Sequence, residues 1–429
     1  MTNRLFDFLA DSPVNFLAVR ALETRLQTAG FEPLDASKAL PKLAPGSCFY
    51  VKKNDSSLYA FRIGRQSFAE GGMHIICSHC DSPTFRVKPN AEMLSGGMLR
   101  LNTEVYGGPI MSTWFDRPLS LAGRVIVRGK DALHPETLLL HVQRPLLQIS
   151  NLAIHFNRQV NDGVKLSKQK DMLPIMGLIQ EELEKEGVLL PLIANELSVK
   201  AEDILDFDLY LYDTTPACTF GLHQEFISAG RLDDLSMVHA SLEALLAAGT
   251  EVPEVMQVMA VFDNEETGSQ TKQGAGSPFL SSILQRINEQ QGGTLEDYFC
   301  GVERSFMVSA DNAHAWHPNY NEKYDPTNHP TLGGGPVIKF NAAQKYASDA
   351  ASAAVFASLC EQAGVPCQRF VNHSDVAGGS TLGNILASSL PLRGVDMGNP
   401  ILGMHSVRET GAVADHEACI RAFTEFYRS

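Results

Sequence analysis

The sequence contains no long apolar segment. None of its hydrophobic runs approaches the roughly 20 apolar residues that a helix needs to cross a bilayer, and residues 1–10 show no cleavable signal pattern. We therefore expect neither a membrane partner nor export. The eight cysteines are scattered through 429 residues, which favours reduced thiols in a cytoplasmic protein over a disulfide framework.

Clusters of basic residues are also missing. The formal net charge is -14, and binding to nucleic-acid phosphates requires a basic face. We therefore expect no nucleic-acid partner. The net charge does not restrict the substrate, because a locally positive pocket can exist within an acidic protein.

One pair of cysteines, Cys77 and Cys80, has the CxxC spacing of redox and zinc-thiolate sites. The sequence has no second pair at zinc-finger spacing. The apolar run around Cys77 predicts a strand, which would direct the two thiols to opposite faces of a sheet. We therefore exclude both a redox pair and a zinc-thiolate pair.

The length exceeds that of one ordinary hydrophobic core, so two domains are expected. Residues 1–87 and 228–429 show an α/β pattern, whereas residues 88–227 show short alternating strands and Gly-rich turns. Alternating strands and helices predict a sheet covered by helices on both faces. The predicted helices are 14–29, 236–248, 342–363 and 415–427, the last with Asp415 as N-cap. The predicted strands are 47–52, 58–63, 73–78, 98–105, 119–127, 137–142, 204–212, 255–262, 305–310, 336–340 and 392–395.

Five short segments carry histidine or carboxylate side chains. They are residues 78–83, 230–234, 262–269, 309–314 and 403–406. We expect four of them to follow a strand, and the segment with Asp233 to precede a helix. Ligands of open α/β sheets bind outside the carboxyl ends of the strands, so these segments predict one shared site.

The residue types in these segments fit two divalent cations. Zn²⁺ accepts His nitrogen and carboxylate oxygen, and Co²⁺ or Mn²⁺ would suit the same ligands. Two ions about 3.5–4 Å apart can clamp both the attacking and the leaving side of a hydrolysis. Asp81, two residues beyond His79, would accept a hydrogen bond from its imidazole and fix its tautomer. Of the adjacent Glu265 and Glu266, one can bind metal while the other accepts a proton from water.

These motifs resemble those of the aspartyl aminopeptidase family of metallopeptidases, over roughly residues 6–427. The resemblance implies that one carboxylate bridges two metal ions and that two further ligands hold each ion. The bridge would be Asp233, the ligands of one ion His79 and Asp311, and those of the other Glu266 and His405.

The same resemblance assigns catalytic roles and an architecture. Glu265 would be the general base, and Asp81 would support His79. The fold would be α/β, with a central mixed sheet covered by helices on both faces and an inserted mainly-β lid or dimerisation domain. The enzyme would remove N-terminal residues from peptides with a free amine, preferring Asp or Glu, and would assemble into a dodecamer built from dimers.

Further residues resemble the family's substrate site. His155, in the segment 151–158, would reach into the active site of a neighbouring subunit and steady the tetrahedral intermediate; the alternative is an interface histidine. His314, Lys339 and Tyr346 would line the substrate pocket, and Asp375 would lie in a loop that anchors the substrate near its amine. The Lys339 ammonium would favour an acidic first residue through a charge-assisted hydrogen bond, unless it is a salt-bridged lysine at a strand end.

Two other functions use the same residues. A related dinuclear deacylase would act on N-acyl amino acids with the same metals and base. A shell-forming protein without catalytic activity would use the metals only to stabilise its structure. Glu265 argues against the second alternative, because a purely structural metal site needs no unligated carboxylate.

Overall fold

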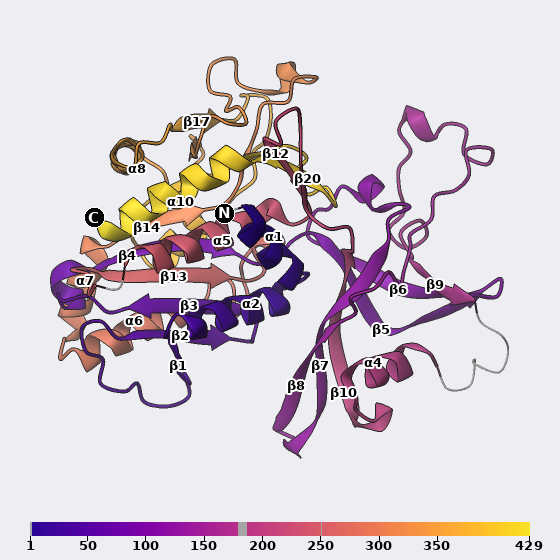
Figure 1. The fold of residues 1–429 in the computed structure, drawn as a ribbon, viewed down its shortest axis with the longest axis horizontal. Coiled ribbons are helices and arrows are strands. Elements are labelled where there is room, and N and C mark those ends of the chain that lie inside the picture. Colours follow the sequence, from indigo (N-terminus) through magenta and orange to yellow (C-terminus); the bar gives the residue numbers. More distant parts are fainter. Residues whose placement is uncertain (1, 179–186, 250) are drawn as a thin grey trace.

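A nine-stranded sheet forms the centre of the larger part of the molecule (Figure 1). The computed structural model describes residues 2–178, 187–249 and 251–429. In spatial order the strands are β1 (Glu32–Pro33), β2 (Cys48–Lys53), β3 (Ser57–Arg62), β13 (Met256–Phe262), β4 (Met73–His79), β14 (Phe306–Ala310), β18 (Arg393–Gly398), β16 (Val337–Phe340) and β17 (Gln368–Val371). The central strands β13, β4, β14 and β18 run parallel, whereas β3 and β16 join them antiparallel. The sheet is therefore mixed, as predicted.

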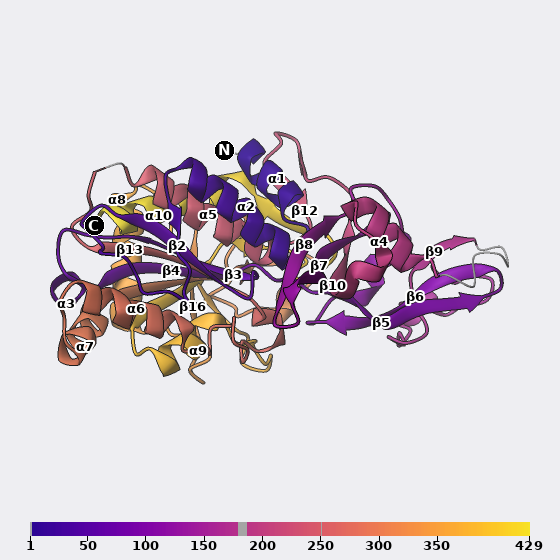
Figure 2. The same cartoon turned by 90° about the horizontal axis from the view of Figure 1, so that it is seen from below.

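Helices cover both faces of this sheet (Figure 2). One face carries α1 (Thr2–Asp11), α2 (Asn15–Thr28), α5 (Leu232–Ala247), α8 (Ala350–Gln362) and α10 (Val413–Arg428). The other face carries α3 (Phe68–Gly71), α6 (Phe279–Gln290), α7 (Leu295–Arg304) and α9 (Leu382–Ser389). Each layer closes its own hydrophobic core, and Cys77 and Cys80 lie in different cores as free thiols. The prediction that the two thiols face opposite ways is confirmed.

A six-stranded antiparallel sheet projects from the other side of the molecule (Figure 1). Its strands in spatial order are β8 (His134–His141), β7 (Leu119–Asp131), β10 (Ile204–Asp213), β5 (Thr84–Ser95), β6 (Met98–Tyr106) and β9 (Ile175–Leu178). With α4 (Leu189–Leu197) it encloses a third hydrophobic core. Strand β5 begins directly after the first His-containing segment, so β6 returns to the large sheet at Tyr106.

A small sheet joins the two halves next to α5. Strands β11 (Cys218–Phe220), β12 (Phe226–Ala229) and β20 (Glu409–Ala412) are antiparallel, and Ala229 pairs with Glu409. Strands β15 (Ala313–His314) and β19 (Pro400–Ile401) form a two-stranded parallel sheet, and β19 lies beside β20. Pairing of β12 with β20 brings residues around 230 beside residues around 409.

The predicted helix 342–363 begins later in the structure, at Ala350. Asp349 is the N-cap, because its carboxylate accepts a hydrogen bond from the Ser352 amide. Asp415 is not the N-cap of α10, which begins at Val413. The Asp415 carboxylate instead accepts hydrogen bonds from the amides of Gly333 and Gly335.

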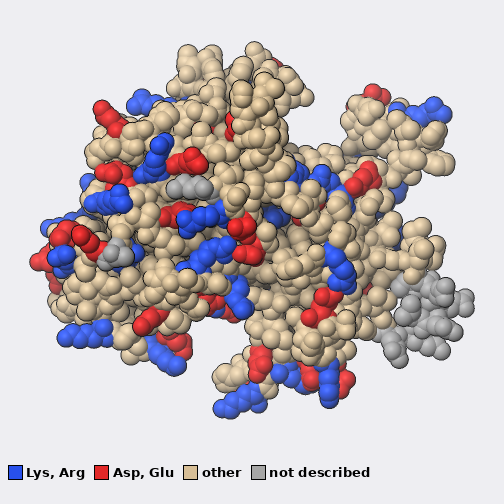
Figure 3. All heavy atoms as spheres, in the orientation of Figure 1, with Lys and Arg blue, Asp and Glu red and all other residues tan. Residues whose placement is uncertain are grey.

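Charged side chains of both signs lie on the face of the molecule that Figure 3 shows. On the face seen in Figure 3, Lys and Arg side chains are interspersed with Asp and Glu. Among the described residues, none of the helices combines the length and the apolar character needed to cross a membrane.

Two histidines meet in the core between α5 and α10. His239 Nδ1 lies 3.0 Å from His416 Nε2, and both side chains are buried. Burial lowers the pKa of His416 to about 4. Burial, and then the neighbouring His416, hold the pKa of His239 well below its ordinary value. The pair is therefore neutral in the folded protein at neutral pH, although Glu243 lies 3.7 Å from His239.

Acidification is expected to destabilise the protein through this pair. Because its folded-state pKa is depressed, the contribution of His416 is complete above pH 6.5 and is lost as the pH falls toward about 4. The loss amounts to about 1.4 kcal/mol of unfolding free energy per pH unit for each such histidine. Urea unfolding of the wild type and of His416→Gln between pH 4 and pH 7 measures it. The free energy of unfolding should fall less steeply with decreasing pH in the variant than in the wild type. An equal pH dependence of the two proteins would contradict the assignment.

Candidate metal centre

Histidine and carboxylate side chains gather at one end of the central strands. Candidate ligand atoms lie within 4.8 Å of one another in three overlapping groups. The groups are His79, Asp233, Asp234 and Asp311; His79, Glu265 and Glu266; and Asp233, Glu266 and His405. The structure thus brings together the five residues that the sequence predicts as metal ligands.

Buried strands place three of these segments. His79 ends β4, Asp311 follows β14 directly, and Glu265 begins a short 3-10 helix (Glu265–Thr267) after β13. Every residue of β13 and β14 is buried, as is typical of parallel strands covered on both faces. Their carboxyl ends meet at one edge of the sheet, which is why residues far apart in sequence converge there.

The other two segments reach the site differently. Asp233 was expected to precede a helix that begins at residue 236, but α5 begins at Leu232, so Asp233 lies in its first turn with non-helical φ and ψ angles. His405 does not follow a strand of the nine-stranded sheet, as we had expected, but lies in the turn between β19 and β20. Its φ angle of 68° is in the left-handed region, which residues other than glycine occupy rarely.

Asp233 faces both histidines. Its Oδ1 lies 3.7 Å from His79 Nε2 and its Oδ2 lies 3.5 Å from His405 Nε2. Oδ1 is buried and has no hydrogen-bond partner among the described residues. A buried carboxylate oxygen without a donor is unfavourable unless something else binds it. This oxygen therefore points to a cation between Asp233 and His79.

Both histidines present the same nitrogen to the cluster. His79 Nδ1 lies 3.0 Å from the main-chain oxygen of Asp81, and His405 Nδ1 lies 3.0 Å from that of Gly108. A carbonyl oxygen only accepts, so each Nδ1 must carry the proton and each Nε2 keeps a free lone pair. Such a contact is the usual way to orient a metal-binding histidine.

Lys339 binds Asp311, one of the carboxylates grouped with His79. Its Nζ donates to the main-chain oxygen of Asp311 at 2.8 Å, to Asp311 Oδ2 at 3.2 Å and to the main-chain oxygen of Asn312 at 3.3 Å. Burial opposes ionisation of Asp311, but the Lys339 charge outweighs it and holds the pKa of Asp311 below its ordinary value. Asp311 Oδ1 remains 3.9 Å from His79 Nε2.

The crowding of carboxylates suits divalent cations. Burial, followed by the nearby carboxylates, raises the pKa of Glu265 to about 8 and raises that of Glu266 well above its ordinary value. Cations among these side chains would offset the repulsion. Free imidazole nitrogens and carboxylate oxygens at mutual distances below 4.8 Å are the ligand types that zinc takes. The residues present therefore fit a metal.

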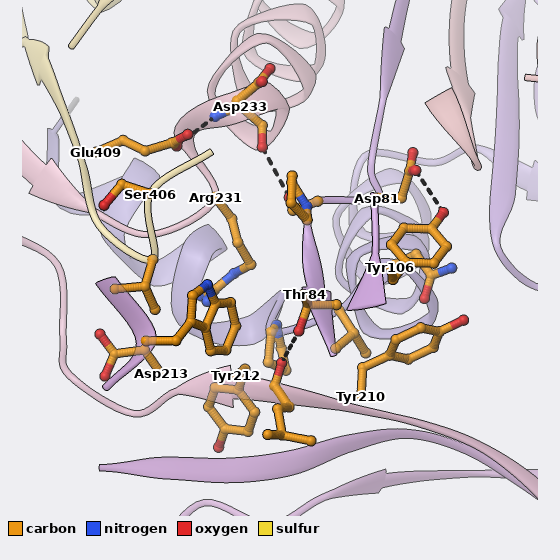
Figure 4. Close-up of a pocket in the computed structure, with 18 of the residues that line it drawn as sticks. Asp81, Thr84, Tyr106, Tyr210, Tyr212, Asp213, Arg231, Asp233, Ser406 and Glu409 are labelled. Atoms are coloured by element: carbon orange, nitrogen blue, oxygen red, sulfur yellow. Dashed lines mark hydrogen bonds between the residues drawn. The ribbon is translucent and has the colours of Figure 1, made fainter. Parts of the chain in front are cut away.

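Asp81 supports the site in a way that differs from the prediction. The imidazole of His79 contacts the main-chain oxygen of Asp81, whereas Asp81 Oδ1 lies 3.4 Å away. The Asp81 carboxylate instead accepts from the amides of Glu265 and Glu266, at 3.1 and 3.2 Å, and from the Tyr106 hydroxyl at 2.7 Å (Figure 4). Asp81 thus holds the main chain of the two adjacent glutamates.

The end of β6 carries contacts from the six-stranded sheet into the cluster. Tyr106 binds Asp81, and Gly108 accepts from His405. Between them, Gly107 has a φ of 68°, and a Cβ there would lie 3.1 Å from Glu266 Cβ. Residues 106–108, which we call the β6 tip, therefore lie against Asp81 and against two residues of the cluster, Glu266 and His405.

Asp234 stands beside the cluster with its carboxylate engaged. Its Oδ2 accepts from the His79 amide at 3.1 Å, and its Oδ1 lies 3.3 Å from Asn312 Nδ2. Asp234 therefore anchors the main chain of His79.

The predicted substrate-site residues lie in different surroundings. Lys339 is only 2% exposed, and Asp311 and Asn312 take all three of its N–H groups, as in the salt-bridged alternative. Tyr346 is buried beside it, with its ring centre 5.3 Å from Nζ. His314 ends β15, is exposed, and packs its ring near Phe370.

Two other predicted residues lie outside the cluster. His155 is exposed in the loop that connects β8 to β9 and extends away from the large sheet (Figure 1). The Asp375 carboxylate is 93% exposed and lies next to His373. Neither is brought to the candidate metal ligands within this chain.

A hollow between the two large sheets lies against the back of the cluster (Figure 4). It is lined by Tyr106, Tyr210, Tyr212 and Arg231, and it reaches Asp81 and Asp233. The candidate ligands His79, Glu266 and His405 are not among the residues that line it. We therefore separate this hollow from the metal centre.

Sequence reasoning missed two residues that contact the cluster, Tyr106 and Glu409. Glu409 is buried and binds the amides of Asp233 and His405. For Glu409, the only signal is its position four residues after a predicted ligand, and for Tyr106 there is no local signal.

Known proteins match this chain along nearly its whole length. Residues 8–427 match the family described as Aminopeptidase I zinc metalloprotease (M18). A Probable M18 family aminopeptidase 2 from Clostridium acetobutylicum is 52% identical over 425 residues, covering 99% of this chain and 98% of the relative. The structure of the Ape4 and Nbr1 complex aligns with a TM-score of 0.95 at 38% identity, covering 99% of this chain and 85% of that one.

A second solved structure, the S. cerevisiae mApe1 dodecamer, aligns with a TM-score of 0.85 at 25% identity, covering 99% of this chain and 95% of that one. The family match and the full-length relative extend across both sheets of the molecule. This chain belongs to the M18 family of zinc metallo-aminopeptidases.

Proposed function

We propose that this aminopeptidase uses two zinc ions and removes N-terminal Asp or Glu from peptides with a free amine. The observation that carries the two-ion proposal is the position of Asp233. One of its oxygens faces His79 and the other faces His405, so Asp233 belongs to two ligand groups at once. A carboxylate in this position could bind one ion with each of its oxygens.

The proposed ligands divide around this bridge. His79 and Asp311 would hold one ion, and Glu266 and His405 the other, with Asp233 shared between them. When bound, the ions would supply Lewis acidity to the scissile carbonyl. The chain's own contacts prepare the ligands: Asp81 and Gly108 turn each Nε2 toward the cluster.

Glu265 is the proposed general base. The Glu265 amide donates to Asp81 Oδ1 at 3.1 Å, whereas the Glu266 amide donates to Asp81 Oδ2. Each of the two adjacent glutamates therefore has its own main-chain contact. Glu266 Oε1 lies 3.4 Å from His405 Nε2, so Glu266 is the glutamate that would share an ion with His405. Glu265 would accept a proton from the attacking water and deliver it to the leaving amine.

The preference for acidic residues rests on the resemblance to aspartyl aminopeptidases and on the buried charge of Lys339. The ammonium is shared with Asp311, so it is not a free partner for a substrate carboxylate. If Asp311 binds zinc, however, its negative charge is divided between two cations. Lys339 would then retain a favourable field for an acidic side chain.

We also propose that the chain assembles into dodecamers built from dimers, as the S. cerevisiae mApe1 dodecamer suggests. The β8–β9 loop exposes Leu152, Ile154 and Phe156 by 60%, 53% and 81%. Exposed apolar side chains around His155 support an interface between copies. Residues 88–227 would then form the lid and dimerisation domain, and the free thiols fit a cytoplasmic location.

Zinc titration and a substrate panel test this function. Apoenzyme prepared with a chelator should regain activity only as the second equivalent of zinc per chain binds. Full activity after one equivalent would contradict the dinuclear site. Peptides beginning with Asp or Glu should give the highest kcat/KM, and their N-acetylated forms should not be cleaved. Cleavage of the acetylated forms would instead support a deacylase.

A further inference from the structure

Glu409 connects two metal-ligand segments that are distant in sequence. Its Oε2 accepts from the Asp233 amide at 3.0 Å (Figure 4), and its Oε1 accepts from the His405 amide at 2.8 Å. The side chain is only 3% exposed. Each carboxylate oxygen therefore serves one ligand residue.

The local backbone explains why both amides need this acceptor. Asp233 has non-helical φ and ψ angles inside the first turn of α5, so its amide lies where a helix leaves N–H groups unpaired. His405 has a positive φ, and its amide lies in a tight turn after Gly403. Strand β20 pairs with β12 through Ala229 and Glu409, which fixes the Glu409 backbone beside both segments.

We propose that Glu409 is a positioning residue that sets the relation between Asp233 and His405 and thereby the affinity of the site for zinc. The proposal rests on the metal-binding roles proposed above for these two residues. Glu409 acts through their main chains, so their side chains remain free for the cation. A carboxylate suits this task because it accepts at both oxygens, whereas an amide accepts at one.

Two variants separate positioning from charge. Glu409→Gln keeps the shape but presents an NH₂ group to one of the two amides. Glu409→Asp keeps the charge but is one methylene shorter, so it cannot reach both amides. Supporting partners of metal ligands change affinity by about 10–100-fold, and we expect a loss of this size in both variants.

Asp415→Asn provides a matched control. Asp415 is also a buried carboxylate that accepts from two amides, those of Gly333 and Gly335, and these glycines are not among the proposed ligands. This variant loses the same kind of hydrogen bond in another part of the core. It should change the melting temperature of the apoprotein but not its zinc affinity.

The experiment is a chelator competition for zinc, with melting curves of apoprotein and zinc-loaded protein. Weak zinc binding by Glu409→Gln and Glu409→Asp, with wild-type affinity in Asp415→Asn, supports positioning. Wild-type affinity in Glu409→Asp overturns it, because charge alone would then suffice; this variant also carries the test if Glu409→Gln does not fold.

The remaining outcomes separate this proposal from the proposed function. If the wild type binds zinc tightly and the Glu409 variants bind it equally tightly, only the role of Glu409 is overturned. If the wild type itself binds no zinc, both proposals are overturned.

Discussion

Replacing Glu265 with Gln is expected to lower kcat by about 10²–10⁴-fold, the usual contribution of a general base. Gln has nearly the same shape as Glu but cannot accept a proton. The Glu265 amide would still bind Asp81, so the main chain of the site should keep its form. Steady-state kinetics at saturating substrate and the zinc content per chain measure the two effects. Zinc content should not change.

Glu266→Gln is the matched control, because it alters the neighbouring carboxylate of the same short helix. Because Glu266 is a proposed ligand and faces His405, the Glu266→Gln variant should bind less zinc than the wild type. The two variants therefore separate base from ligand. Full turnover in zinc-loaded Glu265→Gln would show that another group takes the proton.

Replacing His155 with Gln is expected to lower kcat by about 10²–10³-fold, the loss seen when a donor to a tetrahedral intermediate is removed. The histidine is exposed in its own chain and would complete the site of a neighbouring subunit. The fold and the zinc content of the variant should not change, since His155 contacts none of the described ligands. Kinetics and zinc analysis of the purified oligomer provide the measurement.

Mixing inactive chains tests whether the site is shared. In a two-fold dimer, a His155→Gln chain paired with a Glu265→Gln chain forms one site with both defects and one with neither. Random pairing should therefore restore about a quarter of wild-type activity. If His155 served its own chain, every site would carry one defect and no activity would return. An active wild-type monomer would also contradict the proposal that two subunits share each site.

The convergence of His79, Asp233, Glu266, Asp311 and His405 could be predicted from sequence because each lies in a short polar segment beside an apolar element. Contacts between distant segments could not be predicted in this way. The Lys339 ammonium binds Asp311, and the His79 imidazole binds the main-chain oxygen of Asp81 rather than its carboxylate. Such details depend on how strands are ordered in the sheet, and no local pattern reports that order.

Some elements had signals that the sequence interpretation did not use. No helix was expected at 295–304, although Thr294 and Asp297 form a capping box at its start. The first helix buries Leu5, Phe8 and Leu9 along one face. The predicted helix 342–363 extended too far because its Ala-rich composition outweighed the cap at Asp349.

The β6 tip bears on how this enzyme can change over evolution. Inserted domains are often tolerated as removable modules, because few contacts cross their boundaries. Here Tyr106 and Gly108 contribute a hydroxyl and a carbonyl oxygen to the surroundings of Asp81 and His405. A descendant that lost or exchanged the insertion would lose both groups at once. We therefore expect residues 88–227 and the rest of the chain to be inherited as a unit, with substitutions on one side compatible with the other.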